Sequence, residues 1–500
     1  MFKPLPDSLY RSGRLLGRAA ATILLCAAVS AQAQDLNVAD TPTPEMLGTD
    51  EPVGQLQEPY ATSGDLPTHG ITVVPRLSVM QTFTDNVNQA SSGKQAEQVT
   101  EISPGIHIAS GKGRLRGYFD YALRAVGYGQ SSRSDSYLNA LDTVGKFEAV
   151  DRILYVDFTG AIAQQAITAF GTQSGAGAYS TTNRTEVSNY RLSPYLQGRL
   201  GDLVNYVVRM DRLVTQSDSA SAPGTFASQN SITIDGTRAD RTIGWLMDVS
   251  RTGVDYSGGR YTESDLSDVG LSYAFTPQLS VFAKAGVEAN NYTTVDKQSH
   301  ATNEVGLKWN PSERTQLLAS QGHRSFGESH AVSMEHSTNL VVLKLSDVRD
   351  VSTTPAPFVS AVSGFVLSAL SLQRRQDLTL TLRGVRDTLA FAVTQTESTR
   401  VDTLSTAPDD LARGTVHQSG ARISYLHRLT PVFNLGFIAS LQQAWGAPSL
   451  PDSWLREFSM NLTGKVTRKS AVAVGLRHAS YTGATPYEEN AVTFNLTVEF

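Results

Sequence analysis

Three histidines, His323, His330 and His336, lie close together in the sequence, next to acidic residues such as Glu328 and Glu335. Imidazole and carboxylate groups bind zinc when three or four of them converge on one point. The residues around them alternate like strands joined by a loop, which turns neighbouring side chains to opposite faces. The pattern favours ordinary wall and loop histidines, and no metal site is expected.

Nucleophilic catalysis has equally weak support in the sequence. His323 with Ser325 and His336 with Ser337 are the nearest serine–histidine pairs, but neither has an identifiable third member or oxyanion element. The G-x-S-x-G pattern is absent. Residues 85–88 (DNVN) look like a fragment of a calcium loop, but an Asp/Asn-rich turn explains them better. We therefore expect no enzyme activity, no catalytic residue and no cofactor.

Arginine is the charged residue that recurs in a pattern. Six arginines fall on the polar side of alternating stretches: Arg114, Arg116, Arg124, Arg191, Arg199 and Arg209. Facing a lumen, such rows could form a selective surface for anionic sugars or small anions. Carboxylates such as Asp157 and Asp211 occupy the same stretches, so pairing across strands, without any binding role, is the competing interpretation.

The strict alternation of apolar and polar residues predicts that these arginines lie on the polar face of β-strands. From Ile71 onward, segments of about ten residues have one apolar face and one polar face, with turn residues between them. Around Arg116 the apolar face holds Leu115, Phe119 and Tyr121. A strand between lipid and an aqueous lumen needs this pattern. Aromatic residues near strand ends, such as Tyr118, Tyr195 and Trp309, suggest interfacial girdles where they share the lipid-side parity. For lumen-facing members the alternative is a stacking surface for sugar rings.

Short and long links alternate along the chain. The short links are 110–113, 150–152, 201–202, 276–278, 310–313, 384–386, 428–432 and 467–469. The longer polar links include 84–98, 165–185, 215–226, 252–264, 289–301 and 397–416. This asymmetry is typical of periplasmic turns and outer loops. Counting predicts an all-β fold, a single transmembrane antiparallel β-barrel of about 22 strands over 71–500, with 20 to 24 allowed.

Two regions leave the count open. Residues 328–347 are divided into two strands so that the number stays even. Residues 348–376 form the longest link, where Val362, Val366, Ala369 and Leu370 have helical spacing. A short helix in the mouth or lumen and an extra hairpin are both compatible with that link.

The last strand alternates without a break and ends on a free phenylalanine. Its apolar residues are Val492, Phe494, Leu496, Val498 and Phe500. This ending resembles the C-terminal signal by which bacterial outer-membrane barrels are recognised for insertion. The resemblance implies the barrel-assembly machinery and outer-membrane lipid as partners. The competing interpretation is an edge strand of a secreted sandwich.

The N-terminus indicates export. Basic residues including Arg14 and Arg18 precede an apolar run over 19–30, and Ala31-Gln-Ala33 is an A-x-A cleavage site. We therefore assign residues 1–33 to a secretory signal peptide, cleaved near Ala33. The one cysteine, Cys26, lies inside this signal. The predicted mature chain then lacks disulfides, and a closed barrel is one way to be stable without them.

Residues 34–70 differ from everything that follows. They hold five prolines and seven acidic side chains, with no Lys or Arg and no periodicity. The composition predicts a flexible periplasmic arm, which could be a spacer, a plug or a handle for a periplasmic partner. The whole chain has a net charge of −5, of which the signal contributes +3 and the arm −7. The barrel region therefore carries −1. No basic surface suited to nucleic acid is expected.

Several short stretches resemble a known family. They are residues 71–79 (ITVVPRLSV), 84–88, 102–106, 306–315, 322–327 and 487–491. They resemble bacterial outer-membrane β-barrel proteins that accompany exosortase (PEP-CTERM) exopolysaccharide loci, within the broader β-barrel porin 2 group. The resemblance implies an outer-membrane location and a polysaccharide context, and it brings no catalytic residues.

These observations support one leading hypothesis and two others. The leading one is a porin-like passage or scaffold that serves export of an extracellular polysaccharide, with the polysaccharide chain and periplasmic export components as partners. The second is a general or substrate-specific diffusion porin for uptake. The third is a plugged structural barrel that anchors periplasmic partners through 34–70.

Overall fold

The computed structural model describes residues 70–130, 135–174, 183–201, 203–219, 224–237, 242–256, 260–352, 370–404, 410–447 and 450–500. The predicted signal peptide 1–33 lies outside the described residues, and so does the predicted arm 34–70 except for Gly70. In the described part, no helix is long and apolar enough to cross a membrane.

The described residues form strands and one short 3-10 helix. The strands of the first half are β1 (Ile71–Thr84), β2 (Glu97–Ser110), β3 (Leu115–Tyr128), β4 (Ser136–Val150), β5 (Leu154–Ala166), β6 (Arg184–Leu200), β7 (Val204–Ser217), β8 (Thr225–Thr237), β9 (Ile243–Tyr256), β10 (Tyr261–Thr276) and β11 (Leu279–Asn290). Those of the second half are β12 (Gln298–Ser312), β13 (Thr315–Arg324), β14 (Gly327–Ser337), β15 (Val341–Ser352), β16 (Ser371–Arg383), β17 (Asp387–Arg400), β18 (Val416–Arg428), β19 (Phe433–Trp445), β20 (Ser453–Thr467), β21 (Ser470–Thr482) and β22 (Tyr487–Glu499). The helix η1 spans Asp410–Arg413.

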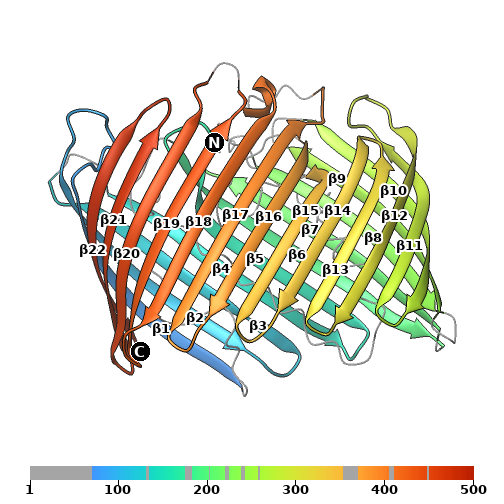
Figure 1. Cartoon of the computed structure of the whole chain (residues 1–500), viewed down its shortest axis with the longest axis horizontal. Helices are drawn as coiled ribbons and strands as arrows, with labels where there is room; N and C mark the ends of the chain where they lie inside the picture. Colours follow the sequence, from blue (N-terminus) through green and yellow to red (C-terminus); the bar gives the residue numbers. More distant parts are fainter. Residues whose placement is uncertain are drawn as a thin grey trace, which may run out of the picture.

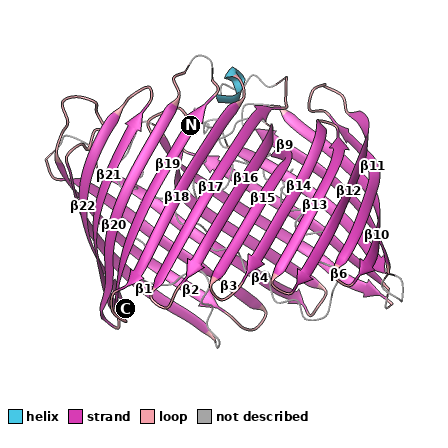
Figure 2. Ribbon diagram, in the orientation of Figure 1, coloured by secondary structure: helices cyan, strands magenta, loops and turns pink. Residues whose placement is uncertain are grey.

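All strands belong to one closed antiparallel sheet of 22 strands (Figures 1 and 2). Each strand pairs with its neighbours in sequence, and β1 pairs with β22 from Arg76 opposite Glu499 to Thr84 opposite Ala491. Closure leaves no free edge in the sheet, which removes the template for pairing with other chains. The predicted all-β barrel and its strand number are confirmed.

The two ends of the barrel differ in their links. Even-numbered strands connect to the following odd-numbered strands by short turns, at the end where β1 begins and the chain terminates (Figure 1). We call this end the turn end and the opposite end the loop end. The predicted long link 252–264 is wrong in extent, because β9 continues to Tyr256 and β10 already begins at Tyr261. Cross-strand backbone pairing there extends the ladder into residues whose polar side chains look like a loop in the sequence.

The region divided into two strands to keep the count even does contain two, β14 and β15. The link predicted over 348–376 is shorter at both ends, since β15 continues to Ser352 and β16 begins at Ser371. The proposed helix or hairpin falls largely on 353–369, which lie outside the described residues.

The outer face of the wall carries the apolar rows. Phe494 and Leu496 on β22 are both about half exposed, and Leu271 and Phe275 on β10 are more exposed still. Phe83 on β1 meets Phe494 edge-on, with ring centroids 6.3 Å apart, so the apolar row continues across the closing seam. Phe500 follows β22, and its backbone N–H donates to the carbonyl of Pro75 at 2.9 Å. In water such a surface would be unfavourable, whereas in a bilayer it faces lipid.

Candidate inner-wall site

The alternate residues face the interior and are mostly polar. Arg76 on β1 reaches past β2 to Asp120 on β3, with Nη2 2.5 Å from Oδ1. His107 Nδ1 on β2 lies 3.0 Å from the other oxygen of Asp120. Such contacts link neighbouring strands, or strands two apart, through side chains on the inner face. They identify which alternate residues of β1, β2 and β3 face the interior.

Three of the predicted arginines are paired with carboxylates on this inner face. Arg191 on β6 donates to Asp211 on β7 at 2.9 Å. Arg209 contacts both Asp157, at 3.2 Å, and Asp211, at 3.3 Å. Arg124 lies 3.6 Å from the buried Glu101. Pairing across strands therefore describes these three better than a free anion-binding row.

The other three predicted arginines lie at the turn end. Arg114 precedes β3, Arg116 is its second residue, and Arg199 is the penultimate residue of β6. All three are exposed, and Arg199 Nε donates to Asn205 Oδ1 at 3.0 Å. Among the described residues, none of the three has a carboxylate within ion-pair distance. The sequence pattern that selected six similar arginines did not separate these two groups.

Further cations with inner parity share this end of the barrel. Together with Arg116 and Arg199 they form what we call the cation arc: Arg116, Lys146, Arg199, Arg383, Arg428 and Lys465. In order around the barrel, its members lie on β16, β18 and β20 and then, past the β22–β1 seam, on β3, β4 and β6. β1 therefore begins in the middle of the arc. Inner-facing acids such as Glu148 are fewer along the same strand ends. The turn-end opening is therefore lined by positive charge along roughly half of its circumference.

An aromatic stack holds part of this charge in place. The rings of Tyr155 on β5 and Tyr195 on β6 stack with centroids 5.3 Å apart. Lys146 Nζ lies 4.7 Å from the Tyr155 centroid, and the Arg209 guanidinium lies 4.9 Å from that of Tyr195. Cations over aromatic faces gain electrostatic stabilisation without a carboxylate. Tyr195, and Tyr118 which donates to Asp142, face inward, so these two tyrosines are not part of a lipid-side girdle.

At the loop end, the segment 167–174 that follows β5 folds onto the far side of the seam. Tyr481 on β21 places its hydroxyl 2.9 Å from the carbonyl oxygens of Phe170 and Gly171. Tyr487 on β22 donates to the carbonyl of Gln173 at 2.7 Å. Phe170 is buried in a small apolar cluster with Leu411 of η1. We call this segment the latch, because it joins β5 to β20–β22 across the intervening strands.

A carboxylate binds the first residues of the latch. Thr168 Oγ1 and the backbone N–H of Ala169 both donate to Asp410 of η1 at 2.8 Å. Asp410 belongs to the link between β17 and β18, so three separate parts of the chain meet at the loop end. No sequence pattern predicted this arrangement, because none of these residues stands out by type or spacing.

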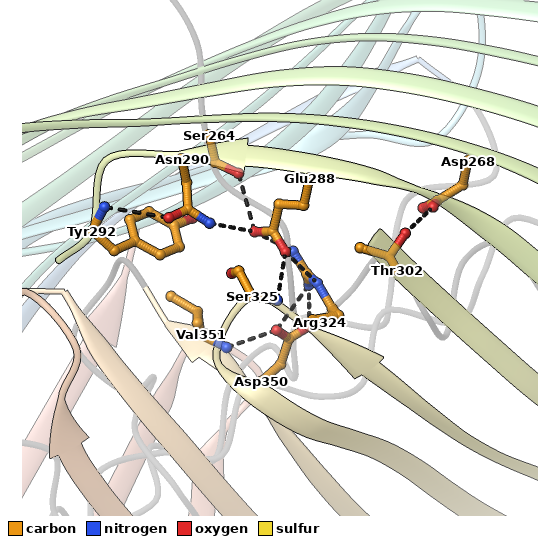
Figure 3. A network of polar contacts seen from close by, with 10 residues as sticks. All are labelled: Ser264, Asp268, Glu288, Asn290, Tyr292, Thr302, Arg324, Ser325, Asp350 and Val351. Carbon is orange, nitrogen blue, oxygen red and sulfur yellow. Dashed lines mark hydrogen bonds and ion pairs between the residues drawn. The ribbon is translucent and has the colours of Figure 1, made fainter. Parts of the chain in front are cut away.

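A second polar network joins β11, β13 and β15 near the loop end (Figure 3). Arg324 at the end of β13 donates to Glu288 on β11, with Nη2 3.1 Å from Oε1, and to Asp350 on β15, with Nη1 3.0 Å from Oδ1. Glu288 is fully buried and also accepts from Ser264 at 3.2 Å. Tyr292 packs beside this network, and burial raises the pKa of its hydroxyl. The network joins the three alternate strands β11, β13 and β15. Its charged groups are bound to one another, which is the arrangement of a structural ion-pair network.

The histidines do not converge. His330 Nε2 lies 3.0 Å from Asp347, and His336 Nδ1 lies 2.8 Å from Thr315 Oγ1. His323 stands opposite Glu328 in the β13–β14 ladder. In the part of the chain that the structure describes, no group of three or more His, Cys, Asp or Glu residues could hold a metal ion.

Known proteins resemble this chain in architecture only. No protein-family model matches it, and no curated protein is similar to it in sequence. The FrpB iron transporter from Neisseria meningitidis (F3-3 variant) is 9% identical over 85% of this chain and 81% of that one, with a TM-score of 0.47. The siderophore receptor PiuA from Acinetobacter baumannii is 9% identical over 87% and 82%, with a TM-score of 0.43. OccK2 (OpdF) from Pseudomonas aeruginosa, solved with glucuronate, is 10% identical over 86% and 98%, with a TM-score of 0.35.

The chain's own geometry defines its class. A closed antiparallel sheet with an apolar outer face, a polar interior, short turns at one end and longer loops at the other is the architecture of outer-membrane β-barrels. A wall of 22 strands encloses a space too wide for its own side chains to fill. The protein is therefore a porin-like or transporter-like outer-membrane barrel.

Proposed function

We propose that this barrel serves the passage of an anionic extracellular polysaccharide across the outer membrane, from the periplasm outward. The cation arc carries this proposal. It lies at the turn end, which is the periplasmic end in barrels of this kind, and there an exported chain would arrive. Positive charge at an opening raises the local concentration of an anionic chain and speeds its encounter with the pore.

The rest of the inner wall supports movement along the pore. Arg191 and Arg209 are already neutralised by Asp157 and Asp211, so the wall beyond the arc offers many weak contacts. Conduction requires binding that is favourable enough to capture the chain and weak enough to release it. A positively charged opening that captures the chain, followed by a wall whose arginines are paired with carboxylates, meets both requirements.

The proposed export direction and its partners can be tested in cells. A strain lacking the gene should accumulate polysaccharide in the periplasm and release less of it. Complementation with the Arg116→Gln, Arg199→Gln, Arg383→Gln and Arg428→Gln variant should restore the barrel in the membrane but not full secretion. Normal secretion by the deletion strain would exclude the export role. Loss of uptake of a small nutrient in the same strain would favour a diffusion porin.

A further inference from the structure

A small pocket lies at the turn end, between the turn that follows β16 and the turn that follows β18. Its volume is about 280 Å³, and the residues that line it include Arg386, Thr388, Leu426, Arg428, Pro431 and Asn434. Ligand pockets in proteins start at roughly 300 Å³, so this one has room for a small ligand such as a single sugar unit.

Two arginines stand opposite each other in this pocket. Asp387 pairs with His427 in the β17–β18 ladder, and one residue further along the backbone N–H of Arg428 donates to the carbonyl of Arg386 at 2.7 Å. Like charges placed opposite each other on neighbouring strands repel. Among the described residues, neither arginine has a carboxylate within ion-pair distance. An anion bound between the two guanidinium groups would remove the repulsion.

The one acidic side chain in the rim of the pocket is engaged elsewhere. Asp387 accepts a hydrogen bond from Tyr425 Oη at 2.6 Å, and Nδ1 of His427 lies 2.7 Å from the same oxygen. By strand alternation these three residues belong to the outer face, whereas Thr388 and Arg428 belong to the inner face. The carboxylate of Asp387 is therefore held away from the two arginines.

The other polar groups of the pocket can donate hydrogen bonds. Asn434 stands opposite Arg428 in the β18–β19 ladder, so its amide lies beside the guanidinium groups, as does the hydroxyl of Thr388. Leu426 and Pro431 add apolar surface. Charged and neutral donors next to an apolar wall suit an oxyanion group carried on a carbon ring.

The two turns that form the pocket are fixed by their own hydrogen bonds. The backbone N–H of Gly384 donates to the carbonyl of Asp387 at 2.7 Å, which closes the turn between β16 and β17. In the turn between β18 and β19, Thr430 Oγ1 accepts from the N–H of Phe433 at 3.0 Å. A site held in place before its ligand arrives loses less entropy on binding.

We infer that this pocket is a binding subsite for the carboxylate of an acidic sugar unit, with Arg386 and Arg428 as its charged donors. A uronate presents a planar carboxylate, which a guanidinium binds through two parallel hydrogen bonds. The source of the ligand rests on the proposed function, because the pocket lies at the periplasmic opening, where an exported anionic chain would arrive. Both arginines are exposed, so the bound sugar can also leave.

The test measures monosaccharide binding to the full-length barrel, purified in detergent and titrated by ligand-observed NMR. The probes are methyl β-glucuronide and methyl β-glucoside, which share a ring and differ in one carboxylate. We expect the glucuronide to bind at least tenfold more tightly, with an affinity that falls as salt is added. Equal affinities for the two sugars would overturn the inference, and so would inorganic phosphate that binds as tightly as the glucuronide.

The variant Arg386→Gln with Arg428→Gln should lose at least tenfold in glucuronide affinity and keep its weak affinity for the glucoside. Arg386→Lys with Arg428→Lys keeps the charge without the paired donors, so its loss should be smaller. Arg152→Gln with Arg468→Gln is the matched control, because it removes two charges from exposed turns outside the pocket. The change in gel mobility on heating verifies that each variant is folded. Equal losses in the pocket variant and the control would contradict the assigned site.

Binding of a monosaccharide does not require export, so failure of the subsite and failure of the proposed function are distinguishable. Normal secretion by the deletion strain, with a purified barrel that still selects the glucuronide, would exclude the proposed function and retain the subsite. Impaired secretion by that strain, with a barrel that binds both sugars equally, would overturn the subsite and retain the proposed function.

Discussion

Thr84 on the first strand donates a hydrogen bond to Glu489 on the last strand, with 2.8 Å between the hydroxyl and carboxylate oxygens. Both side chains are buried, and Glu489 also accepts from Arg477 on β21 at 2.8 Å. The seam that closes the barrel is therefore held on its inner side by a hydrogen bond to a buried carboxylate, which is itself paired with Arg477, in addition to the backbone ladder between β1 and β22.

Replacing Glu489 with alanine should destabilise the closed barrel. Arg477 would keep a buried guanidinium without this carboxylate, a change that costs about 3 kcal/mol or more. The measurement is the guanidinium chloride midpoint of the folded band in detergent. Glu488→Ala is the matched control, because the neighbouring side chain is exposed and faces outward, and its effect should stay within about 0.5 kcal/mol. Equal midpoints for the two variants would contradict a role of Glu489 in the seam.

The terminal residue should matter for assembly more than for stability. Phe500→Asn is expected to lower the amount of folded barrel recovered from membranes severalfold, because the C-terminal strand resembles the signal for insertion. Leu340→Asn is a suitable control, since Leu340 is 65% exposed, as Phe500 is, and lies in the β14–β15 turn. Normal assembly of the Phe500→Asn protein would remove support for the terminal signal.

Loosening the latch should increase conductance. Tyr481→Phe with Tyr487→Phe removes the two hydroxyl groups that hold the latch backbone, while the rings and their stacking remain. Two such hydrogen bonds are worth about 2 kcal/mol together, which is roughly a thirtyfold change in a two-state equilibrium. Single-channel recordings should show longer open times. Tyr425→Phe, which removes a hydroxyl at the turn end, serves as the control. If the double variant and this control gave the same traces, the latch would not narrow the pore.

The Arg324 network should contribute strongly to stability. Arg324→Met would leave Glu288 and Asp350 buried together without their shared counter-charge, at a cost of about 3–5 kcal/mol. Adding Glu288→Gln to that variant should recover part of the loss, because one buried charge is then removed. Arg374→Met provides a comparison, since its ion pair with Asp347 is partly exposed and worth about 1 kcal/mol or less. A similar loss for Arg324→Met and Arg374→Met would argue against a buried, coupled network.

Charge reversal in the arc should change ion preference. Arg116→Glu with Arg199→Glu places negative charge at the periplasmic opening, where contact between two charges in water is worth about 1 kcal/mol, or roughly fivefold in relative permeability. The reversal potential under a KCl gradient should move from anion preference toward cation preference. Arg152→Glu, at an exposed turn, should leave it unchanged. An unaltered reversal potential in the double variant would place the arc outside the conduction path.

Local patterns were enough to predict most of the fold. Alternation such as that around Phe119 and Asp120 is a property of each strand alone, so it showed the strand type and the two faces. The even strand number was instead a requirement of a closed barrel, and it guided the division of 328–347 into two strands. Link extents were harder to predict. At residues 252–264 the polar side chains look like a loop, yet pairing between β9 and β10 continues through most of them.

The candidate site divides in the same way. That Arg191 and Arg199 both face the lumen follows from parity, which the sequence contains. That Arg191 is neutralised by Asp211 while Arg199 contacts the uncharged Asn205 depends on register between neighbouring strands and on depth in the wall. The latch, with Asp410 held against Thr168, depends on contacts between residues far apart in the chain, for which no local pattern exists.

The sequence by itself predicts an export signal, and it determined the acidic character of 34–70 and a barrel whose residues alternate between lipid and lumen, because these are set by composition and by a period of two. Only the tertiary structure decided which charges are paired across strands and where the cations of the turn end gather. Closing β1 against β22 brings the first and last strands together, and with them two runs of cations that the sequence keeps more than one hundred residues apart. The cation arc around the start of β1 is therefore a consequence of closure.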